Sequence, residues 1–221
     1  PTINSQEKTN VQTKIATLLC VAMMTVSVQV MSADRFEAGK DYMVLESMQP
    51  TSTGDKVEVL EFFSYGCPHC AHLEPVLQEW KQNSAPAGVS IVRVPVAWNE
   101  GFETFARVYY AAEMAGASDE AHAAMFKLLH EDKPEQLNLQ IVADTFGGHG
   151  VDAATFIQYF GSKEVTSRVA QAKELARRYK VTGVPVIFVD GTYEVPSPKG
   201  GNFHRMMQVV SYLSEEAGGT P

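Results

Sequence analysis

The segment Lys-Val-Glu-Val-Leu-Glu-Phe-Phe-Ser-Tyr-Gly-Cys-Pro-His-Cys at residues 56–70 joins a strand-like run to a pair of cysteines. The run at 56–63 is rich in β-forming residues, and the break at 64–66 ends it. Apolar residues then recur at intervals of three and four, which predicts one face of a helix, at positions 73, 76, 77 and 80. We therefore expect a central strand, a sharp turn, and Cys67 at the N-terminus of a helix.

The elements predicted after this segment indicate an α/β fold. Strand signals are absent from 99 to about 170, where apolar helical stripes alternate with glycines, and a longer helix is expected over 162–179. Asp190-Gly191 is a strong signal for a hairpin between two of the later strands. This order predicts an α/β core that is interrupted by an all-helical block. The strands that we expect besides the first are 89–96, 186–189 and 192–195.

The composition is that of an ordinary globular protein with an acidic balance. The 221 residues carry a formal net charge of −8, with 45% hydrophobic and 20% charged residues. No basic cluster in the sequence offsets the negative charge, which argues against binding of nucleic acid through its phosphates. This length is sufficient for one sizeable domain, or for one domain that carries an insertion.

The beginning of the chain has the composition of a secretory signal peptide. Lys8 and Lys14 precede an uncharged, largely apolar stretch at 15–30, and two small residues follow it. The stretch is short and contains polar side chains, whereas a membrane-spanning helix needs about twenty apolar residues. We expect residues 1–32 to be a cleaved signal peptide, with a retained anchor and an unprocessed tail as the alternatives.

Three cysteines occur in the chain, and Cys20 lies inside the predicted signal peptide. A disulfide between the remaining two, Cys67 and Cys70, closes almost no loop and would stabilise the fold little. The pair therefore serves chemistry or a metal. A structural zinc site needs about four ligands. Because the sequence has no second pair of cysteines at this spacing, we expect no metal at the site.

A cysteine pair at the start of a helix is suited to redox chemistry. Exposed backbone N–H groups and the helix dipole favour the thiolate form of Cys67. Cys70 lies one turn further along the helix. It is therefore placed to attack a mixed disulfide on Cys67 and so to resolve it.

Two segments of the chain resemble the DsbA family of bacterial periplasmic disulfide oxidases. Residues 59–64 followed by Cys-Pro-His-Cys are similar to the family's active-site segment, and residues 181–185 are similar to its cis-proline segment. The resemblance covers about residues 35–214 and implies a thioredoxin fold with an inserted all-helical domain. The domain bounds expected on this basis are 33–98 and 171–214 for the two parts of the thioredoxin-like domain, 99–170 for the helical insertion, and 215–221 for a flexible tail.

The resemblance also implies roles for the cysteine pair and its neighbours. Cys67 is expected to be the accessible nucleophile and Cys70 the buried resolving partner. Pro68 and His69 make the pair strongly oxidising, because His69 helps to stabilise the thiolate of the reduced form. Glu61 matches a buried acid beneath the pair and is a candidate proton relay for Cys70. Because it lies in an apolar strand, we expect the pKa of its carboxyl group to be raised.

The second segment supplies the expected substrate-binding residues. Pro185 matches the family's cis proline, which packs beside the disulfide. Val184 precedes it and is expected to offer its backbone to an extended substrate peptide.

Taken together, the resemblance implies a thiol-disulfide oxidase. It would donate the Cys67–Cys70 disulfide to newly exported proteins through a mixed disulfide on Cys67, and it would act as a periplasmic monomer without a cofactor. A membrane quinone reductase of the DsbB type would reoxidise it. The alternatives are a periplasmic disulfide isomerase or reductase of the DsbC or DsbG type, and a peptide-binding chaperone. The former families carry a dimerisation domain upstream, for which this chain has only about thirty residues.

Overall fold

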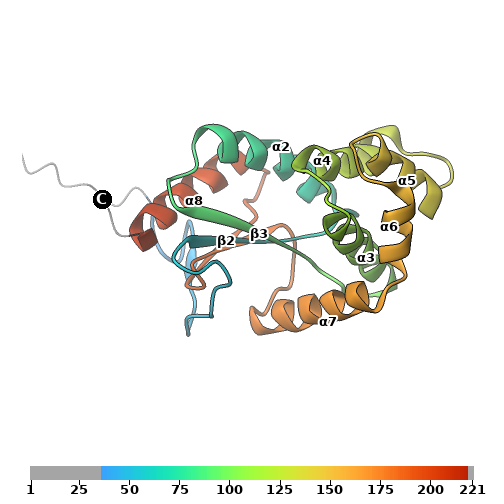
Figure 1. The fold of residues 1–221 in the computed structure, drawn as a ribbon. Helices are drawn as coiled ribbons and strands as arrows, with labels where there is room; N and C mark the ends of the chain where they lie inside the picture. Colours follow the sequence, from blue (N-terminus) through green and yellow to red (C-terminus); the bar gives the residue numbers. More distant parts are fainter. Residues whose placement is uncertain (1–35, 219–221) are drawn as a thin grey trace, which may run out of the picture. The chain divides into compact units, whose positions relative to one another are not determined.

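A five-stranded sheet lies at the centre of the computed structural model, which describes residues 36–218 (Figure 1). The strand order is β1-β5-β4-β2-β3, in which β2 pairs parallel with β3 and antiparallel with β4, while β5 pairs antiparallel with β4 and β1. The strands are β1 (Met43–Val44), β2 (Val57–Phe63), β3 (Val89–Pro95), β4 (Val186–Val189) and β5 (Tyr193–Pro196). The predicted signal peptide, with Cys20, lies outside the described residues, as do residues 219–221.

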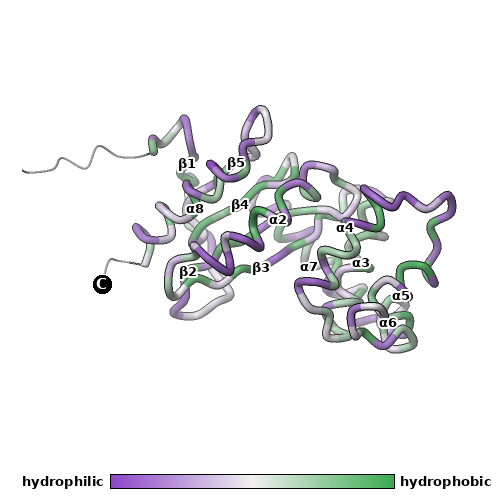
Figure 2. Tube along the Cα trace, turned by 90° about the horizontal axis from the view of Figure 1, so that it is seen from above, coloured by the Kyte–Doolittle hydropathy of each residue, from purple (hydrophilic) through white to green (hydrophobic). Residues whose placement is uncertain are grey.

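Helices cover both faces of this sheet. All seven residues of β2 are buried, as expected for a central strand with both faces covered. On one face, Val59 and its neighbours pack against α2 (Pro68–Asn83) and α8 (Phe203–Gly218). On the other face, the ring of Phe62 lies 5.6 Å from that of Tyr179, the residue that follows α7 (Lys163–Arg178). Figure 2 shows the apolar character of β4 beside β2.

The block between β3 and α7 is helical, as predicted. The rings of Phe146 and Phe156 lie 5.2 Å apart in its core. A capping side chain accepts a hydrogen bond from a backbone N–H at the start of α3 to α7, which explains where these helices begin. The caps are Asn99, Ser118, Asn138, Asp152 and Ser162. The elements of the block are α3 (Glu100–Met114), α4 (Asp119–Lys127), the π-helical turn η1 (Leu128–Asp132), α5 (Leu139–Gly147) and α6 (Ala153–Phe160).

Two of the expected domain bounds do not coincide with breaks in the structure. The bound at residue 170 falls in the middle of α7, which contacts both α3 of the block and β3 of the sheet. The flexible tail expected from 215 also begins too early, because α8 continues to Gly218 and Ala217 packs against the core beneath it. The described residues form one compact unit.

The predicted hairpin is present, with a connection one residue longer than expected. Asp190 and Gly191 both have positive φ, 49° and 59°, and the Thr192 N–H donates to the Val189 carbonyl oxygen. A Cβ at position 191 would lie 2.1 Å from the Gln49 carbonyl oxygen, so this position requires glycine. Strand β1 was not predicted, because two residues are too few for a pattern. Within residues 36–218, no helix has the length and apolarity needed to cross a bilayer.

Candidate active site

Cys67 occupies the N-cap of α2, and Pro68 is the first residue of the helix. The Cys67 N–H donates to the Ser64 carbonyl oxygen at 3.1 Å, which closes the turn between β2 and α2. The side chain of Cys67 is half-buried, whereas Cys70, one turn along α2, is fully buried. Both are free thiols in this structure. The predicted placement of the pair at the start of a helix is confirmed.

The surroundings of Cys67 stabilise its thiolate form and lower its pKa to about 6. The largest cause is a hydrogen bond from the Cys70 thiol; the backbone N–H groups of Cys70 and His69 and the charge of His69 contribute less, while burial opposes them. Most molecules therefore carry a Cys67 thiolate at neutral pH. The contributions of His69 to this shift are smaller than the hydrogen bond from Cys70, and the role expected for His69 stays a prediction.

The thiol of Cys70 has the opposite tendency. Burial, followed by the hydrogen bond and charge of Cys67, raises the Cys70 pKa far above that of an ordinary cysteine. Cys70 therefore keeps its proton while Cys67 is a thiolate. Any step in which the Cys70 sulfur leaves or attacks must deliver or remove this proton, which requires an acid-base group close to it.

Glu61 is the candidate for this group, because its charge acts on Cys70 and its side chain is only 1% exposed. Burial, together with the charge of Glu74, raises the Glu61 pKa to about 7, although Arg93 opposes the shift. The raised pKa was predicted. The sequence did not indicate a partner for this acid, but Glu61 on β2 pairs in register with Arg93 on β3, and Arg93 Nε lies 3.3 Å from Glu61 Oε2.

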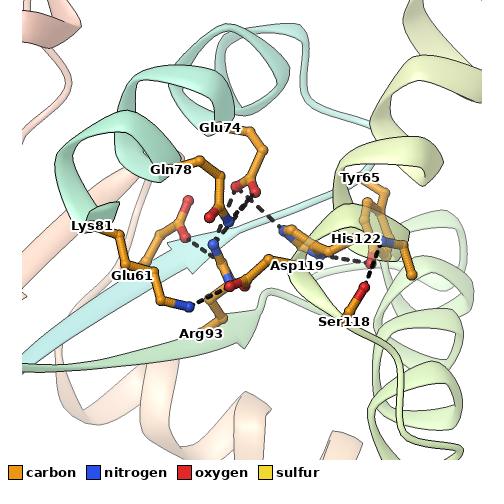
Figure 3. A network of polar contacts seen from close by, with 10 residues as sticks. Glu61, Tyr65, Glu74, Gln78, Lys81, Arg93, Ser118, Asp119 and His122 are labelled. Carbon is orange, nitrogen blue, oxygen red and sulfur yellow. Dashed lines mark hydrogen bonds and ion pairs between the residues drawn. The ribbon is translucent and has the colours of Figure 1, made fainter. Parts of the chain in front are cut away.

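Arg93 joins Glu61 to a larger network of buried polar side chains (Figure 3). Its guanidinium lies 3.4 Å from Glu74 on α2 and 2.8 Å from Asp119 on α4. Glu74 Oε2 in turn lies 3.5 Å from His122 Nε2. Although burial raises the Glu74 pKa, the contacts with His122 and Arg93 outweigh it and hold that pKa below its usual value. The network thus connects the sheet, the active-site helix and the helical block.

Sequence reasoning did not identify this network. Arg93 was passed over within a predicted strand, and Glu74 lies among apolar residues of α2. A charged residue inside an otherwise apolar strand or helix face is the signal that would have indicated a buried ion pair. His122 gives no such signal, because its partners are distant in the sequence.

The second predicted segment lies beside Cys67. The Val184–Pro185 peptide bond is cis, as predicted, and Cys67 Sγ lies 3.4 Å from the Val184 carbonyl oxygen. Residues that are 117 positions apart in the chain are therefore in contact at the reactive sulfur. The substrate-binding role expected for Val184 and Pro185 stays a prediction.

A cavity of about 650 Å³ opens beside His69, between α2 and the loop that joins β5 to α8. His69 and His72 line it from α2, and Lys199 and His204 line it from the opposite side. The rings of His69 and His72 lie 6.4 Å apart.

Comparison with known proteins gives one consistent result. The family described as the DSBA-like thioredoxin domain matches residues 87–214. The thiol:disulfide interchange protein DsbA of Pseudomonas aeruginosa is 32% identical over 196 residues, which are 89% of this chain and 92% of that protein. DsbA of Burkholderia cepacia is 34% identical over 180 residues, covering 81% and 84% of the two chains.

Solved structures agree with the sequence relatives. The crystal structure of Pseudomonas aeruginosa DsbA has a TM-score of 0.75 at 33% identity, covering 84% of this chain and 96% of that one. The oxidoreductase DsbA from Xylella fastidiosa has a TM-score of 0.73 at 32% identity, covering 82% and 97%. The predicted thioredoxin fold is confirmed. Because relatives of 32% and 34% identity cover more than four fifths of this chain and of their own length, the protein belongs to the DsbA family of thiol:disulfide oxidoreductases.

Proposed function

We propose that the protein oxidises newly exported proteins in the periplasm by donating the Cys67–Cys70 disulfide to them through a mixed disulfide on Cys67. The observation that carries the proposal is the contrast between the two thiols. Cys67 is accessible and has a pKa of about 6, whereas Cys70 is buried and its pKa is strongly raised. An incoming thiolate therefore reaches Cys67, and Cys67 is the better leaving group.

The exchange proceeds in two steps. A substrate thiolate attacks Cys67 Sγ, the Cys67–Cys70 bond breaks, and Cys70 takes up a proton. A second substrate thiolate then attacks the substrate sulfur of the mixed disulfide, and Cys67 leaves as a thiolate. Two electrons pass from the substrate dithiol to the pair, and the substrate gains one disulfide.

Glu61 is the proposed source of the proton for Cys70. Its pKa of about 7 means that both of its protonation states are populated near neutral pH, as proton transfer requires. The negative charge of Glu61 also raises the Cys70 pKa, so the two groups interact electrostatically. Protonated Glu61 would give its proton to Cys70 in the first step and recover one from solvent afterwards.

The stabilised thiolate also supports the oxidising direction. Each interaction that favours the Cys67 thiolate lowers the free energy of the reduced protein, and this makes the disulfide easier to give away. The first turn of α2, which begins at Pro68, takes part in this stabilisation. There the backbone N–H groups of His69 and Cys70 stabilise the Cys67 thiolate.

The substrate is proposed to bind as an extended peptide beside Val184 and Pro185. The contact of 3.4 Å between Cys67 Sγ and the Val184 carbonyl places a backbone edge next to the reactive sulfur. The product of the reaction is a reduced pair, so a further oxidant must restore the disulfide. A membrane quinone reductase of the DsbB type is the proposed partner, with this protein acting as a monomer.

The test is the redox equilibrium of the pair with glutathione, measured together with oxidation of a reduced, unfolded dithiol protein. We expect the pair to be more oxidising than glutathione and to transfer its disulfide to the dithiol protein. A potential close to that of thioredoxin would overturn the oxidase and favour a reductase or isomerase.

Two variants test the assignment of the cysteines. In Cys70→Ser the Cys67 thiolate can still attack a disulfide of an exported protein and release one substrate thiolate, but no Cys70 thiol is present to free the adduct, so mixed disulfides should accumulate and disappear on adding reductant. Cys67→Ser is the matched control and should give none. Activity that survives alkylation of both thiols would instead indicate a peptide-binding chaperone.

A further inference from the structure

The turn that carries Cys67 is held by side chains of the helical block. Tyr65 lies at the centre of this turn and is only 1% exposed. Its hydroxyl lies 2.7 Å from His122 Nδ1 on α4, and its carbonyl oxygen accepts a hydrogen bond of 2.7 Å from His130 Nε2 on η1. At the next residue, Gly66, the ring of Phe105 on α3 occupies the space that a Cβ would need, at 2.8 Å. Side chains from α3, α4 and η1 thus contact Tyr65 and Gly66, the two residues before Cys67.

The protonation of the Tyr65–His122 pair follows from its burial. Burial raises the Tyr65 pKa well above its usual value, so the hydroxyl stays protonated and can donate a hydrogen bond to His122 Nδ1. Burial also lowers the His122 pKa, so the imidazole is neutral and its one proton is on Nε2. His122 Nε2 lies 3.5 Å from Glu74 Oε2. Figure 3 shows the ring of His122 directed toward Glu74. His122 therefore links the turn to the buried network around Glu61.

His130 reaches the turn because of an irregularity in the backbone. Residues 128–132 form a π-helical turn in which the Lys133 N–H donates to the Leu128 carbonyl oxygen, and Lys133 ends the turn with a φ of 43°. The wider turn changes the direction of the side chains that follow α4. Single π-helical turns are commonly found where a side chain must be directed to a functional site.

We propose that His122 and His130 are positioning residues for the reactive thiol: by fixing the side chain and the carbonyl of Tyr65, they hold Cys67 Sγ over the start of α2. They act through Tyr65. The thiolate of Cys67 depends on hydrogen bonds from Cys70 and His69, and such bonds weaken steeply when distance or angle departs from the optimum. A turn that loses either histidine would let Cys67 move out of this alignment.

The test uses substitutions that remove one hydrogen bond each. Tyr65→Phe keeps the ring and loses the hydroxyl, and His130→Ala loses the donor to the Tyr65 carbonyl. Each should raise the Cys67 pKa by about half a unit to one unit, and weaken the oxidising power against glutathione by about threefold to fivefold at pH 7. His130→Gln keeps an N–H donor and should restore the wild-type values. The readouts are the thiolate absorbance of Cys67 during a pH titration and the glutathione equilibrium.

Ser211→Ala is the matched control. It removes a 2.7 Å hydrogen bond from Trp80 Nε1 between α2 and α8, away from the turn, so it should lower stability without changing the Cys67 pKa. Folded Tyr65→Phe and His130→Ala variants with wild-type pKa and redox equilibrium would overturn the proposal, as would an equal shift in Ser211→Ala. If Tyr65→Phe does not fold, the comparison of His130→Ala with His130→Gln decides alone.

The inference rests on the proposed function only in taking Cys67 as the reacting thiol. Its readouts report on that thiol directly and do not need a protein substrate. A wild-type protein that fails to oxidise the dithiol protein would refute the proposed function, while the shifts in the Cys67 pKa could still be measured.

Discussion

Cys67 and Cys70 differ in pKa because Cys70 is buried more deeply and because its thiol donates a hydrogen bond that the Cys67 sulfur accepts. The Cys70 thiol stabilises the Cys67 thiolate, and the same contact, added to burial, keeps the proton on Cys70. The charge of one thiol therefore sets the protonation of the other. His69 lowers the Cys67 pKa more through its backbone N–H at the start of α2 than through its charge.

For His69→Ala we expect a small rise of the Cys67 pKa, below about one unit, because the backbone N–H of residue 69 is retained and the charge of His69 is the smallest contribution to the shift. Titration of the thiolate absorbance measures it. A rise of two units or more would show that the imidazole, and not Cys70, is the main stabilising group.

Glu61→Gln should change how stability depends on pH. A carboxyl group whose pKa is raised in the folded state binds protons more tightly there than in the unfolded chain. The wild-type protein therefore loses stability as the pH rises from about 4.5, the ordinary value, to about 7, the folded value. The loss is at most about 3 kcal/mol, and the Glu61→Gln variant does not incur it, because an amide does not ionise.

Urea unfolding of both reduced proteins at several pH values measures this difference. Relative to wild type, Glu61→Gln should gain stability as the pH rises from 4.5 to 7 and should change little further above that. A difference that stays constant across this range would show that Glu61 is ionised throughout, held so by Arg93.

These residues show which features of the site could be predicted from the sequence and which could not. The resemblance to the DsbA active-site segment implied a buried acid at Glu61, and its burial and raised pKa are found in the structure. Arg93 and Glu74 were missed because pairing between strands and helices depends on register in three dimensions. Tyr65 and His122 are 57 residues apart, and no local pattern relates them.

At the scale of elements, most helices and strands were predictable because their patterns are regular. The turn η1 was not, because the spacing of apolar residues through 121–129 is compatible with an uninterrupted α-helix. The pairing of β1 with β5 was also missed, since two residues carry no periodicity. The hairpin at Asp190-Gly191 was predicted because its turn chemistry is local.

Gly191→Ala tests that turn. The residue has a φ of 59°, and an added Cβ would lie 2.1 Å from the Gln49 carbonyl oxygen, so we expect a loss of stability of at least about 2 kcal/mol. Gly88→Ala is the control, because Gly88 has a φ of 81° with no atom within 4 Å of the added Cβ, and it should cost only about 1 kcal/mol. Equal losses in denaturant unfolding would mean that the contact with Gln49 is relieved by movement of the loop.

At the scale of the whole molecule, the stabilised thiolate links redox state to stability. The Cys67 pKa is lowered to about 6, so the stabilisation is present above the ordinary pKa of about 9 and is lost as the pH falls through 6. After allowance for the partial exposure of Cys67, this amounts to about 1 kcal/mol at pH 7. We therefore expect the reduced protein to be more stable than the oxidised protein at neutral pH.

Urea unfolding of the oxidised and reduced forms at pH 8 and pH 5 is the measurement. The reduced form should have the higher midpoint at pH 8, and the gap should narrow at pH 5. Identical midpoints at both values would mean that the thiolate does not stabilise the fold, and the explanation given for the oxidising character would then be wrong.

The strand order of the sheet has a consequence for the synthesis and folding of the protein. Residues 59–62 of the central strand pair with residues 186–189, close to the end of the chain. In a chain that is made from its N-terminus, Cys67 and Cys70 are synthesised long before β4 and the Val184 carbonyl exist. The cysteine pair thus remains an ordinary dithiol in an incomplete polypeptide. The active site is complete only when nearly the whole chain has been synthesised.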